Sequence, residues 1–387
     1  MPLLDIDVRT AGEPSDGVAA VIEDFGLQPG VMGFCRVGIE VPGLDEPWTV
    51  GAILGPSGSG KSLVAHAAFG PACSLEAGWP DRMAVIDAVG DAPLMQRVQA
   101  LTSVGLGSVP CWVRPYSSLS LGERYRAALA REMLRRPALM VCDEWTSVLD
   151  RETARFASYA VSRAVRRGAG AARFVAVTCH SDVAEWLEAD WVLDMVSGSL
   201  TRGRLRRPSL QLSIGRCKGE VWRHFAPHHY LSGAINRTCR CYVATLNGEP
   251  VAFVAMLRSI CARKIRRISR LVVMPWAQGC GIGTALLDWA GEENAAEGYY
   301  TTITAVHPSV EAWLAKSGRW HIWCQRRRGF DWRSYAATHK IAVATAGRAV
   351  TRAEYVGFES EQALGRNRSV RPAWVRGGLK TVVGAQG

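Results

Sequence analysis

The sequence predicts two α/β domains in one chain: a first domain with a parallel sheet and a second of mixed α+β type. The chain has 387 residues, about the size of two ordinary domains. Short apolar runs followed by glycine loops or polar residues recur in both halves, as in buried strands of α/β proteins. The charge also changes along the chain. Residues 1–204 hold 19 basic and 24 acidic residues, and residues 205–387 hold 27 and 11.

The first domain is predicted to span residues 1–204. Apolar runs at 48–54, 138–145 and 172–180 predict strands of a buried parallel sheet. The stretch 151–167 places alanine and valine at helical spacing and predicts a helix. Residues 197–215 are rich in glycine, serine and arginine, which predicts a linker.

The second domain is predicted over residues 205–365. Its elements are a hairpin at 241–257 that turns at Asn247-Gly248, a strand at 268–275, a helix at 284–296 and a strand at 301–306. Residues 366–387 lack periodicity and predict a flexible basic tail.

Composition excludes several classes of protein. No apolar run approaches the ~18 residues that a membrane-spanning helix needs, and the first residues lack the basic and apolar blocks of a signal peptide. The eleven cysteines are scattered without a CxxC pair, which favours reduced thiols and no zinc site. We therefore expect a cytoplasmic protein with no membrane partner.

The first glycine loop is GPSGSGKS at residues 55–62, which follows a predicted strand and matches the full phosphate-binding P-loop pattern. Backbone N–H groups of such a loop and the following helix N-terminus surround the phosphates of a nucleotide such as ATP. A lysine neutralises phosphate charge, and a hydroxyl binds Mg²⁺. The predicted nucleotide-binding residues are Gly55, Ser57, Gly58, Gly60, Lys61 and Ser62.

Four further motifs follow the P-loop in order: LSLGER (119–124), MVCDE (140–144), SVLD (147–150) and TCHSD (178–182). With them the first half resembles the ABC-type ATPases. The resemblance implies ATP and Mg²⁺ as cofactors, Asp143 with Ser62 at the metal, Glu144 as general base, and His180 as the switch histidine.

The same resemblance implies that Asp150 is the acid of the D-loop at the nucleotide site, and that Ser120 and Gly122 act at the nucleotide of a second copy. The chain would then form a homodimer or pair with a second ABC protein. No glutamine in residues 84–106 can be placed as the loop through which transporters couple to membrane segments. A transporter subunit is therefore the least favoured hypothesis.

The second glycine loop is QGCGIG at residues 278–283, between a strand ending in VVMP and a predicted helix. It resembles the loop of the GNAT acetyltransferases, which implies acetyl-CoA or another acyl-CoA as cofactor. Loop N–H groups and the helix dipole suit a pyrophosphate. The coenzyme-binding residues implied by the resemblance are Val272, Gln278, Gly279, Gly281 and Gly283.

Over roughly residues 30–360 the chain resembles ABC-type ATPases fused to a predicted acetyltransferase, and its second half is similar to Mom-like DNA-modification proteins. The latter similarity uses residues 222–237, with His229 and Tyr230, and Arg270. Many GNAT enzymes protonate the leaving thiolate with a tyrosine, but this sequence has Leu314 there. His229 and Tyr230 are the candidate base and acid.

Basic clusters at 202–207, 262–270 and 325–333, with tryptophans among or near them, favour a nucleic-acid partner. The first hypothesis is an ATP-dependent enzyme that acylates a base amine of DNA or RNA. The second is an ATP-gated nucleic-acid clamp with an inactive GNAT fold. The third is an acetyltransferase for a small amine or a protein lysine.

Overall fold

The computed structural model describes residues 3–9, 15–26, 33–73, 75, 78–229, 234–259, 264–326, 350–357 and 380–382. The described chain divides into two compact units. The first unit contains residues 1–78 and 132–207, and the second contains residues 79–131 and 208–387.

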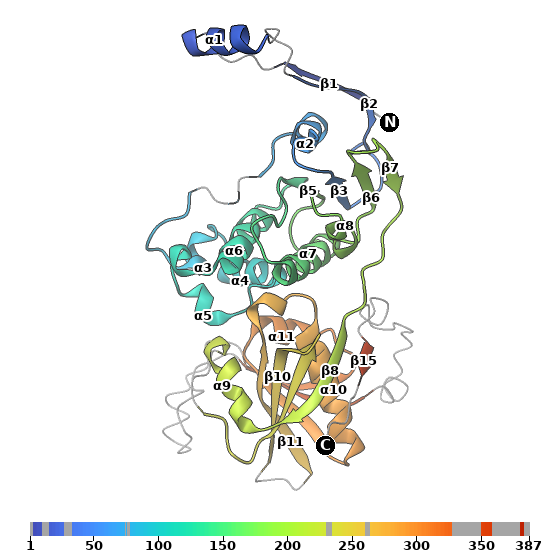
Figure 1. The fold of residues 1–387 in the computed structure, drawn as a ribbon. Helices are drawn as coiled ribbons and strands as arrows, with labels where there is room; N and C mark the ends of the chain where they lie inside the picture. Colours follow the sequence, from blue (N-terminus) through green and yellow to red (C-terminus); the bar gives the residue numbers. More distant parts are fainter. Residues whose placement is uncertain are drawn as a thin grey trace. The chain divides into compact units, whose positions relative to one another are not determined.

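The first unit is built on a five-stranded sheet in the order β4-β5-β3-β6-β7, of which only β7 is antiparallel (Figure 1). Its strands are β3 Val50–Leu54, β4 Met140–Cys142, β5 Phe174–Thr178, β6 Trp191–Asp194 and β7 Leu200–Arg202. Its main helices are α2 Lys61–Phe69, α7 Arg151–Arg166 and α8 Asp182–Trp186. A separate hairpin pairs β1 Leu3–Arg9 with β2 Gly33–Glu40, and α1 Asp16–Phe25 lies between them in sequence.

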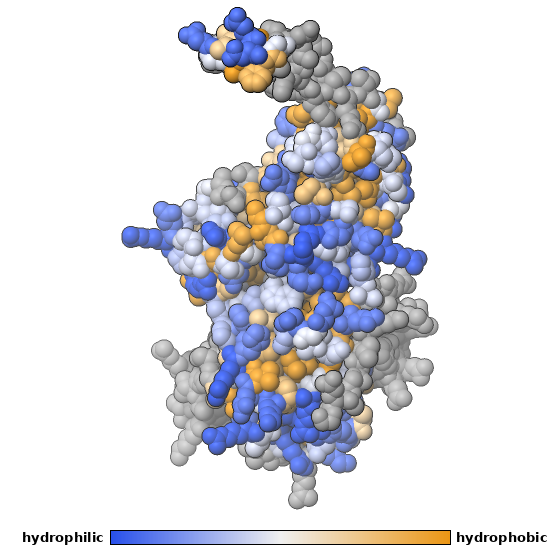
Figure 2. All heavy atoms as spheres, in the orientation of Figure 1, coloured by the Kyte–Doolittle hydropathy of each residue, from blue (hydrophilic) through white to orange (hydrophobic). Residues whose placement is uncertain are grey.

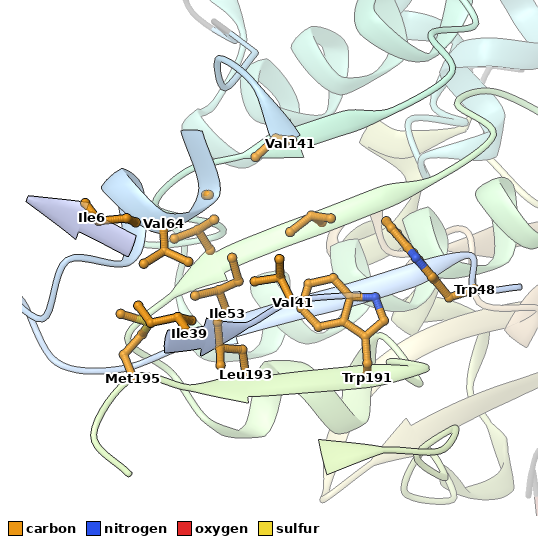
Figure 3. Packing of buried hydrophobic residues seen from close by; sticks show 13 residues of the cluster. Ile6, Ile39, Val41, Trp48, Ile53, Val64, Val141, Trp191, Leu193 and Met195 are labelled. Carbon is orange, nitrogen blue, oxygen red and sulfur yellow. The ribbon is translucent and has the colours of Figure 1, made fainter. Parts of the chain in front are cut away.

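Aliphatic and tryptophan side chains fill the core beside this sheet, as Figure 3 shows. Ile53 of β3, Val64 of α2 and Leu193 of β6 are fully buried there. Trp48 and Trp191 meet edge to face, with ring centroids 5.4 Å apart. This packing fixes the end of β3 and the start of α2, so the loop between them has a rigid base.

The second unit contains an eight-stranded sheet in the order β13-β14-β12-β11-β10-β9-β8-β15. Its strands are β8 Gln211–Cys217, β9 Arg240–Leu246, β10 Glu249–Arg258, β11 Ile265–Val273, β12 Tyr300–Ala305, β13 Trp320–Arg326, β14 Val350–Tyr355 and β15 Lys380–Val382. Most neighbours are antiparallel, but β11 and β12 are parallel and pair only from Ile265 to Ile268. Beyond that point β11 continues to Val273 beside β10 alone, which opens the sheet.

The second unit has two groups of helices: one follows β8 in the sequence, and the other lies in the inserted segment that precedes β8. Following β8 come η2 Gly219–Val221, α9 Trp222–Phe225 and η3 Ala226–His228, and later η4 Pro275–Ala277, α10 Ile282–Ala296 and α11 Pro308–Leu314. The inserted segment 79–131 adds α3 Val85–Ala88, α4 Leu94–Ser103, α5 Val109–Trp112, η1 Tyr116–Ser118 and most of α6 Leu121–Leu134.

The structure divides the chain differently from the sequence-based boundaries. Residues 79–131, which we assign by sequence to the first domain, belong to the second compact unit. The predicted linker 197–215 is shorter, because Leu200–Arg202 and Gln211–Cys217 are strands. In the predicted tail 366–387 only Lys380–Val382 is described, and it forms a strand parallel to β8. The rest of that tail lies outside the described residues.

The predicted hairpin is confirmed as β9 and β10. Asn247 and Gly248 have φ values of +52° and +89°, the left-handed pair that a two-residue turn needs. The predicted strand and helix around the second glycine loop are confirmed as β11 and α10.

Candidate functional site

The first candidate site begins at the loop between β3 and α2. Gly58 and Gly60 have φ values of +78° and +83°, which favour glycine, and Gly60 is the N-cap of α2. The first N–H groups of α2 therefore face the loop, where they and the helix dipole attract an anion. The Nζ of Lys61 donates to the Pro56 carbonyl oxygen at 2.7 Å, so the ammonium group lies at this loop.

The other loop residues named by the sequence have distinct surroundings. The side chains of Ser57 and Ser62 are exposed. A Cβ on Gly55 would come within 2.7 Å of Ser59 Oγ and 2.8 Å of Met195 Cβ. Gly55 therefore lets the chain leave β3 close to β6.

Two acids follow β4 at the same edge of the sheet. Asp143 Oδ1 accepts the backbone N–H of Glu144 at 2.8 Å. Glu144 is exposed and has a φ of +47°, an uncommon conformation for a glutamate that costs free energy. Because β4, β5 and β3 are adjacent and parallel, their carboxyl ends meet at one edge. The sheet therefore brings both acids to the edge from which the P-loop leaves.

His180 follows β5 and reaches the same edge, where its backbone N–H donates to Thr178 Oγ1 at 3.2 Å. Asp150 lies farther along the chain as the N-cap of α7, and its Oδ1 accepts the Thr153 N–H at 2.9 Å. The fold thus places His180 at the edge of the sheet where β3 and β5 end, and gives Asp150 a capping bond.

A Mg²⁺ ion fits the donor chemistry of this edge. The ion prefers oxygen ligands, and the Ser62 hydroxyl and the Asp143 carboxylate supply them. In the parts of the chain that the structure describes, no group of three or more His, Cys, Asp or Glu side chains could hold a metal by itself. An ion here would therefore take its remaining ligands from a nucleotide and water.

The signature motif lies in the second unit at the start of α6. Ser120 and Glu123 form a capping box, in which the Ser120 N–H donates to Glu123 Oε2 at 2.9 Å and the Glu123 N–H donates to Ser120 Oγ at 3.4 Å. Burial acts to raise the pKa of Glu123, but hydrogen bonds from Cys111 and Ser120 outweigh it and lower that pKa. Ser120 is exposed and Gly122 is half-buried. This helix start is thus a fixed structure.

The second candidate site lies where β11 leads through η4 into α10. Gly279 and Gly281 have φ values of +89° and +100°, and Gly281 is the N-cap of α10. A Cβ on Gly283 would lie 3.2 Å from Val273 Cγ2, so glycine lets α10 approach β11 closely. The coenzyme loop, residues 278–283, therefore presents a helix N-terminus beside the opening between β11 and β12.

Gln278 has a structural task in this loop. Its Nε2 donates to the Val273 carbonyl oxygen at 2.9 Å, and its Oε1 accepts the Gly107 N–H at 2.8 Å. The side chain that the sequence assigns to the coenzyme is thus engaged with the protein. Its partner, Gly107, belongs to the inserted segment, which no sequence pattern connects to this loop.

An apolar cluster covers β11 on the face that holds Val272. Trp222 of α9 and Phe253 of β10 belong to this cluster. His229 is 9% exposed, and its ring lies edge to face with Trp222 at 5.6 Å between centroids. The Arg270 guanidinium lies 5.8 Å from the centroid of the same Trp222 ring. The fold thus brings His229 to the cluster that surrounds the coenzyme strand.

The candidate acid Tyr230 lies outside the described residues. Leu314, which occupies the usual tyrosine position, is 1% exposed at the end of α11. His228 is partly buried, and burial lowers its pKa. Of the two catalytic residues predicted for this unit, His229 lies among the described residues and Tyr230 does not.

Comparisons with known proteins find relatives of both predicted domains. Residues 237–319 match the family model of the GNAT acetyltransferase domain. A stretch of 108 residues is 41% identical to the lipoprotein-releasing system ATP-binding protein LolD of Bordetella avium, covering 28% of this chain and 45% of that protein. A stretch of 199 residues is 28% identical to the mitochondrial potassium channel ATP-binding subunit of Xenopus tropicalis, covering 50% of this chain and 26% of that protein.

Solved structures include likenesses to each domain. An IAA acetyltransferase from Bacillus cereus is 20% identical with a TM-score of 0.27 and covers 37% of this chain and 98% of its own. A dimeric ATP-binding cassette bound to ADP and phosphate is 16% identical with a TM-score of 0.35 and covers 46% of this chain and 94% of its own.

The chain therefore carries a domain similar to the ABC-type ATP-binding proteins and a GNAT domain. In this chain the ATP-binding domain precedes the GNAT domain, and the predicted fold class is confirmed. It spans less than half the length of the two ATP-binding relatives above. None of the described helices has the length and hydropathy needed to cross a bilayer.

Proposed function

We propose that this protein binds ATP with Mg²⁺ at the P-loop and transfers an acyl group from acyl-CoA to an amine of a nucleic-acid base. The observation that supports it most is the coenzyme loop at the open end of β11, with His229 and Arg270 gathered around Trp222 on the adjoining face. An anion cradle, an extended strand and a buried imidazole are what acyl transfer from a long pyrophosphate-containing thioester needs.

His229 is the proposed base of the transfer. The amine of the nucleic-acid base would attack the thioester carbonyl carbon, so that the C–S bond breaks and an amide forms. The imidazole of His229 would take the proton that the amine loses and pass it to the leaving thiolate of CoA. His229 is 9% exposed and lies against Trp222, so its ring is held beside the coenzyme strand.

Charge supports a polyanionic acceptor. Ion pairs within the protein neutralise part of the positive charge of residues 205–387, since Glu297 pairs with both Arg240 and Arg266. Arg216 and Arg267 are exposed on β8 and β11, and Arg352 lies over the half-exposed ring of Trp323 at 5.5 Å. Figure 2 shows hydrophilic side chains around an apolar patch on the visible face of this unit. Guanidinium groups beside an exposed tryptophan suit phosphates and a stacked base.

The linker cluster contributes less positive charge than its sequence indicates. Arg202 pairs with Glu40 and Glu46, and Arg204 pairs with Glu188. The cluster 325–333 lies mostly outside the described residues. The proposed acceptor surface is therefore the second unit's own sheet.

The test is acyl transfer with the purified full chain and radiolabelled acetyl-CoA. Duplex DNA, single-stranded DNA, RNA, polyamines and lysine peptides are offered separately, with and without ATP. We expect label in a nucleic acid, recovered as a modified nucleoside by mass spectrometry, and binding that weakens steeply with salt. Label only in polyamines or peptides, or no binding of nucleic acid at ~50 mM salt, contradicts the proposed acceptor.

A second candidate function is an ATP-gated nucleic-acid clamp without transfer activity. The buried Leu314 at the usual tyrosine position favours it. In that case the protein binds nucleic acid in an ATP-dependent way, and no substrate pool receives label. We further propose that the ABC domains of two copies assemble, with Ser120 and Gly122 of one completing the nucleotide site of the other, and that the protein acts in the cytoplasm.

A further inference from the structure

The signature segment, which we define as residues 104–126, is hydrogen-bonded to the coenzyme loop inside the second unit. The two stretches are about 150 residues apart in the sequence. Arg126 of α6 is their central contact. Its Nη2 donates to the Trp276 carbonyl oxygen at 2.6 Å, and its Nη1 is 3.3 Å from the Gln278 carbonyl oxygen and 3.0 Å from that of Gly105.

Arg126 is 2% exposed. Burying a guanidinium is costly unless its donors are satisfied, so a buried arginine whose donors reach carbonyl oxygens of two segments holds those segments together. Gly105 permits this contact. A Cβ at that position would lie 2.1 Å from Arg126 Nη1 and 2.7 Å from the Gln278 oxygen.

A second set of bonds lies beside Arg126. The Gly107 N–H donates to Gln278 Oε1 at 2.8 Å, and the Gly107 carbonyl oxygen lies 2.8 Å from His307 Nε2. Burial lowers the pKa of His307, which favours its neutral form. Trp112 adds a ring contact to His307 at 5.7 Å between centroids. The signature segment thus holds both the coenzyme loop and the residue before α11.

The direction of these bonds affects the anion cradle. In a trans peptide the carbonyl oxygen and the next N–H point to opposite sides. Holding the Gln278 oxygen on Arg126 therefore turns the Gly279 N–H to the other side of that peptide. Arg126 sets the orientation of the first peptide of the coenzyme loop.

A rigid element connects Arg126 to the residues proposed to meet nucleotide. Ser120 caps α6, and Arg126 follows within the first two turns, about 9 Å along the axis. Glu123, which closes the capping box, also accepts a hydrogen bond from Cys111 Sγ at 3.0 Å. A displacement of the helix start therefore reaches Arg126 without a flexible joint.

We propose that Arg126 is a positioning residue that couples the two ligand sites, so that nucleotide engaged by Ser120 and Gly122 tightens the binding of CoA at residues 278–283. This regulation rests on the proposed function, because it needs both ligands to bind. A ligand that shifts the start of α6 also shifts Arg126, so its affinity and the orientation of the coenzyme loop depend on each other.

The test measures the Kd of CoA for the full chain by calorimetry, with and without a non-hydrolysable ATP analogue and Mg²⁺. We expect the analogue to tighten CoA binding at least about fivefold, and CoA to tighten the analogue by the same factor. If CoA binds with a Kd unchanged within about twofold, the coupling is overturned and the proposed function stands. If CoA does not bind under any condition, both are overturned.

Variants assign the coupling to Arg126. Arg126→Gln and Gly105→Ala are expected to reduce the effect of the analogue to below about twofold, with partial rescue in Arg126→Lys, which keeps a cationic donor. Arg135→Gln and Gly298→Ala are matched controls, because Arg135 is exposed and paired with Glu132, and a Cβ on Gly298 meets open space. Full coupling in folded Arg126→Gln overturns the assignment. If that variant fails to fold, Gly105→Ala and the wild-type measurement decide.

Discussion

The two glycine loops of this protein share a design and differ in how they are held. Each joins a strand to a helix, and each ends in a left-handed glycine that caps the helix, Gly60 in one and Gly281 in the other. The P-loop carries its own cation, Lys61, and its base is the core of one sheet. The coenzyme loop contains no charged residue and is fixed by Gln278 and by Arg126 from another part of the chain.

This difference follows from the anions that the loops are expected to bind. A triphosphate concentrates charge, so a lysine at the helix start stabilises it directly. A coenzyme pyrophosphate is one end of a long ligand, and the strand and apolar cluster beside the loop supply further contacts. A loop with no charge of its own depends more on the orientation of its N–H groups, and hence on the residues that set that orientation.

The largest expected effect is on the P-loop. Lys61→Ala removes the loop's cation, and we expect ATP affinity to fall by about 100-fold or more, because a charge-assisted contact to phosphate is lost. CoA affinity measured without nucleotide should stay within about twofold. Titration of a fluorescent ATP analogue measures the first quantity. Lys218→Ala, at an exposed lysine, is the control, and an equal loss in that variant would contradict the assignment.

The next effect is on the coenzyme loop. Gly281→Ala places a Cβ at a φ of +100° and strains the N-cap of α10, so we expect CoA binding to weaken by about tenfold. Gly298→Ala makes the same change at a φ of +77° near the other end of this helix. Calorimetry with CoA should show a loss only in Gly281→Ala. Equal losses would mean that helix stability, and not the loop, controls binding.

A smaller effect concerns the stability of α10. Burial raises the pKa of Asp288 to about 6, although Trp320 donates to it and Arg319 lies 3.3 Å away. Because the folded state holds this proton to higher pH than the unfolded chain does, stability is lost as the pH rises from about 4 through 6. The free energy of unfolding of Asp288→Asn, relative to that of the wild type, should therefore increase by about 2 kcal/mol between pH 4 and pH 7.5. Urea unfolding at several pH values measures this, with exposed Asp91→Asn as control. A pH-independent difference would contradict the prediction.

The smallest effect compares two hydroxyls near the helix starts. The Thr284 hydroxyl donates to the Gly281 carbonyl oxygen at 2.8 Å, whereas the Ser62 side chain is exposed at the predicted metal position. Thr284→Val should change CoA affinity by less than about twofold. Ser62→Ala should reduce the factor by which Mg²⁺ strengthens ATP binding by more than about twofold. Titrations with and without EDTA separate the two. A larger effect of Thr284→Val would show that this hydroxyl meets the ligand.

Local patterns predicted the strands, turns and helices around both candidate sites. The hairpin at Asn247-Gly248, the helices after both glycine loops and the strand before Asp143 all form as expected. These features depend on consecutive residues, whose turn preferences and apolar periodicity act over a few positions. The candidate catalytic residues were found in the same way, through their order along the chain.

Charge and distant contacts could not be predicted in this way. The net charge of a segment does not show which arginines are neutralised, and Glu297 meets Arg240 and Arg266 only through the fold. Arg126 gave no sign in the sequence, because an arginine on a helix is usually solvated. Only the fold shows that it is buried and donates to the Trp276 and Gln278 carbonyl oxygens.

The sequence alone determined that two glycine loops, each opening a helix, occur in this order, because each is encoded by adjacent residues with fixed backbone requirements. The tertiary structure decided that residues 79–131 join the second unit and that the signature segment holds the coenzyme loop. Such contacts depend on surfaces that exist only after the strands and helices have packed, so no run of neighbouring residues encodes them.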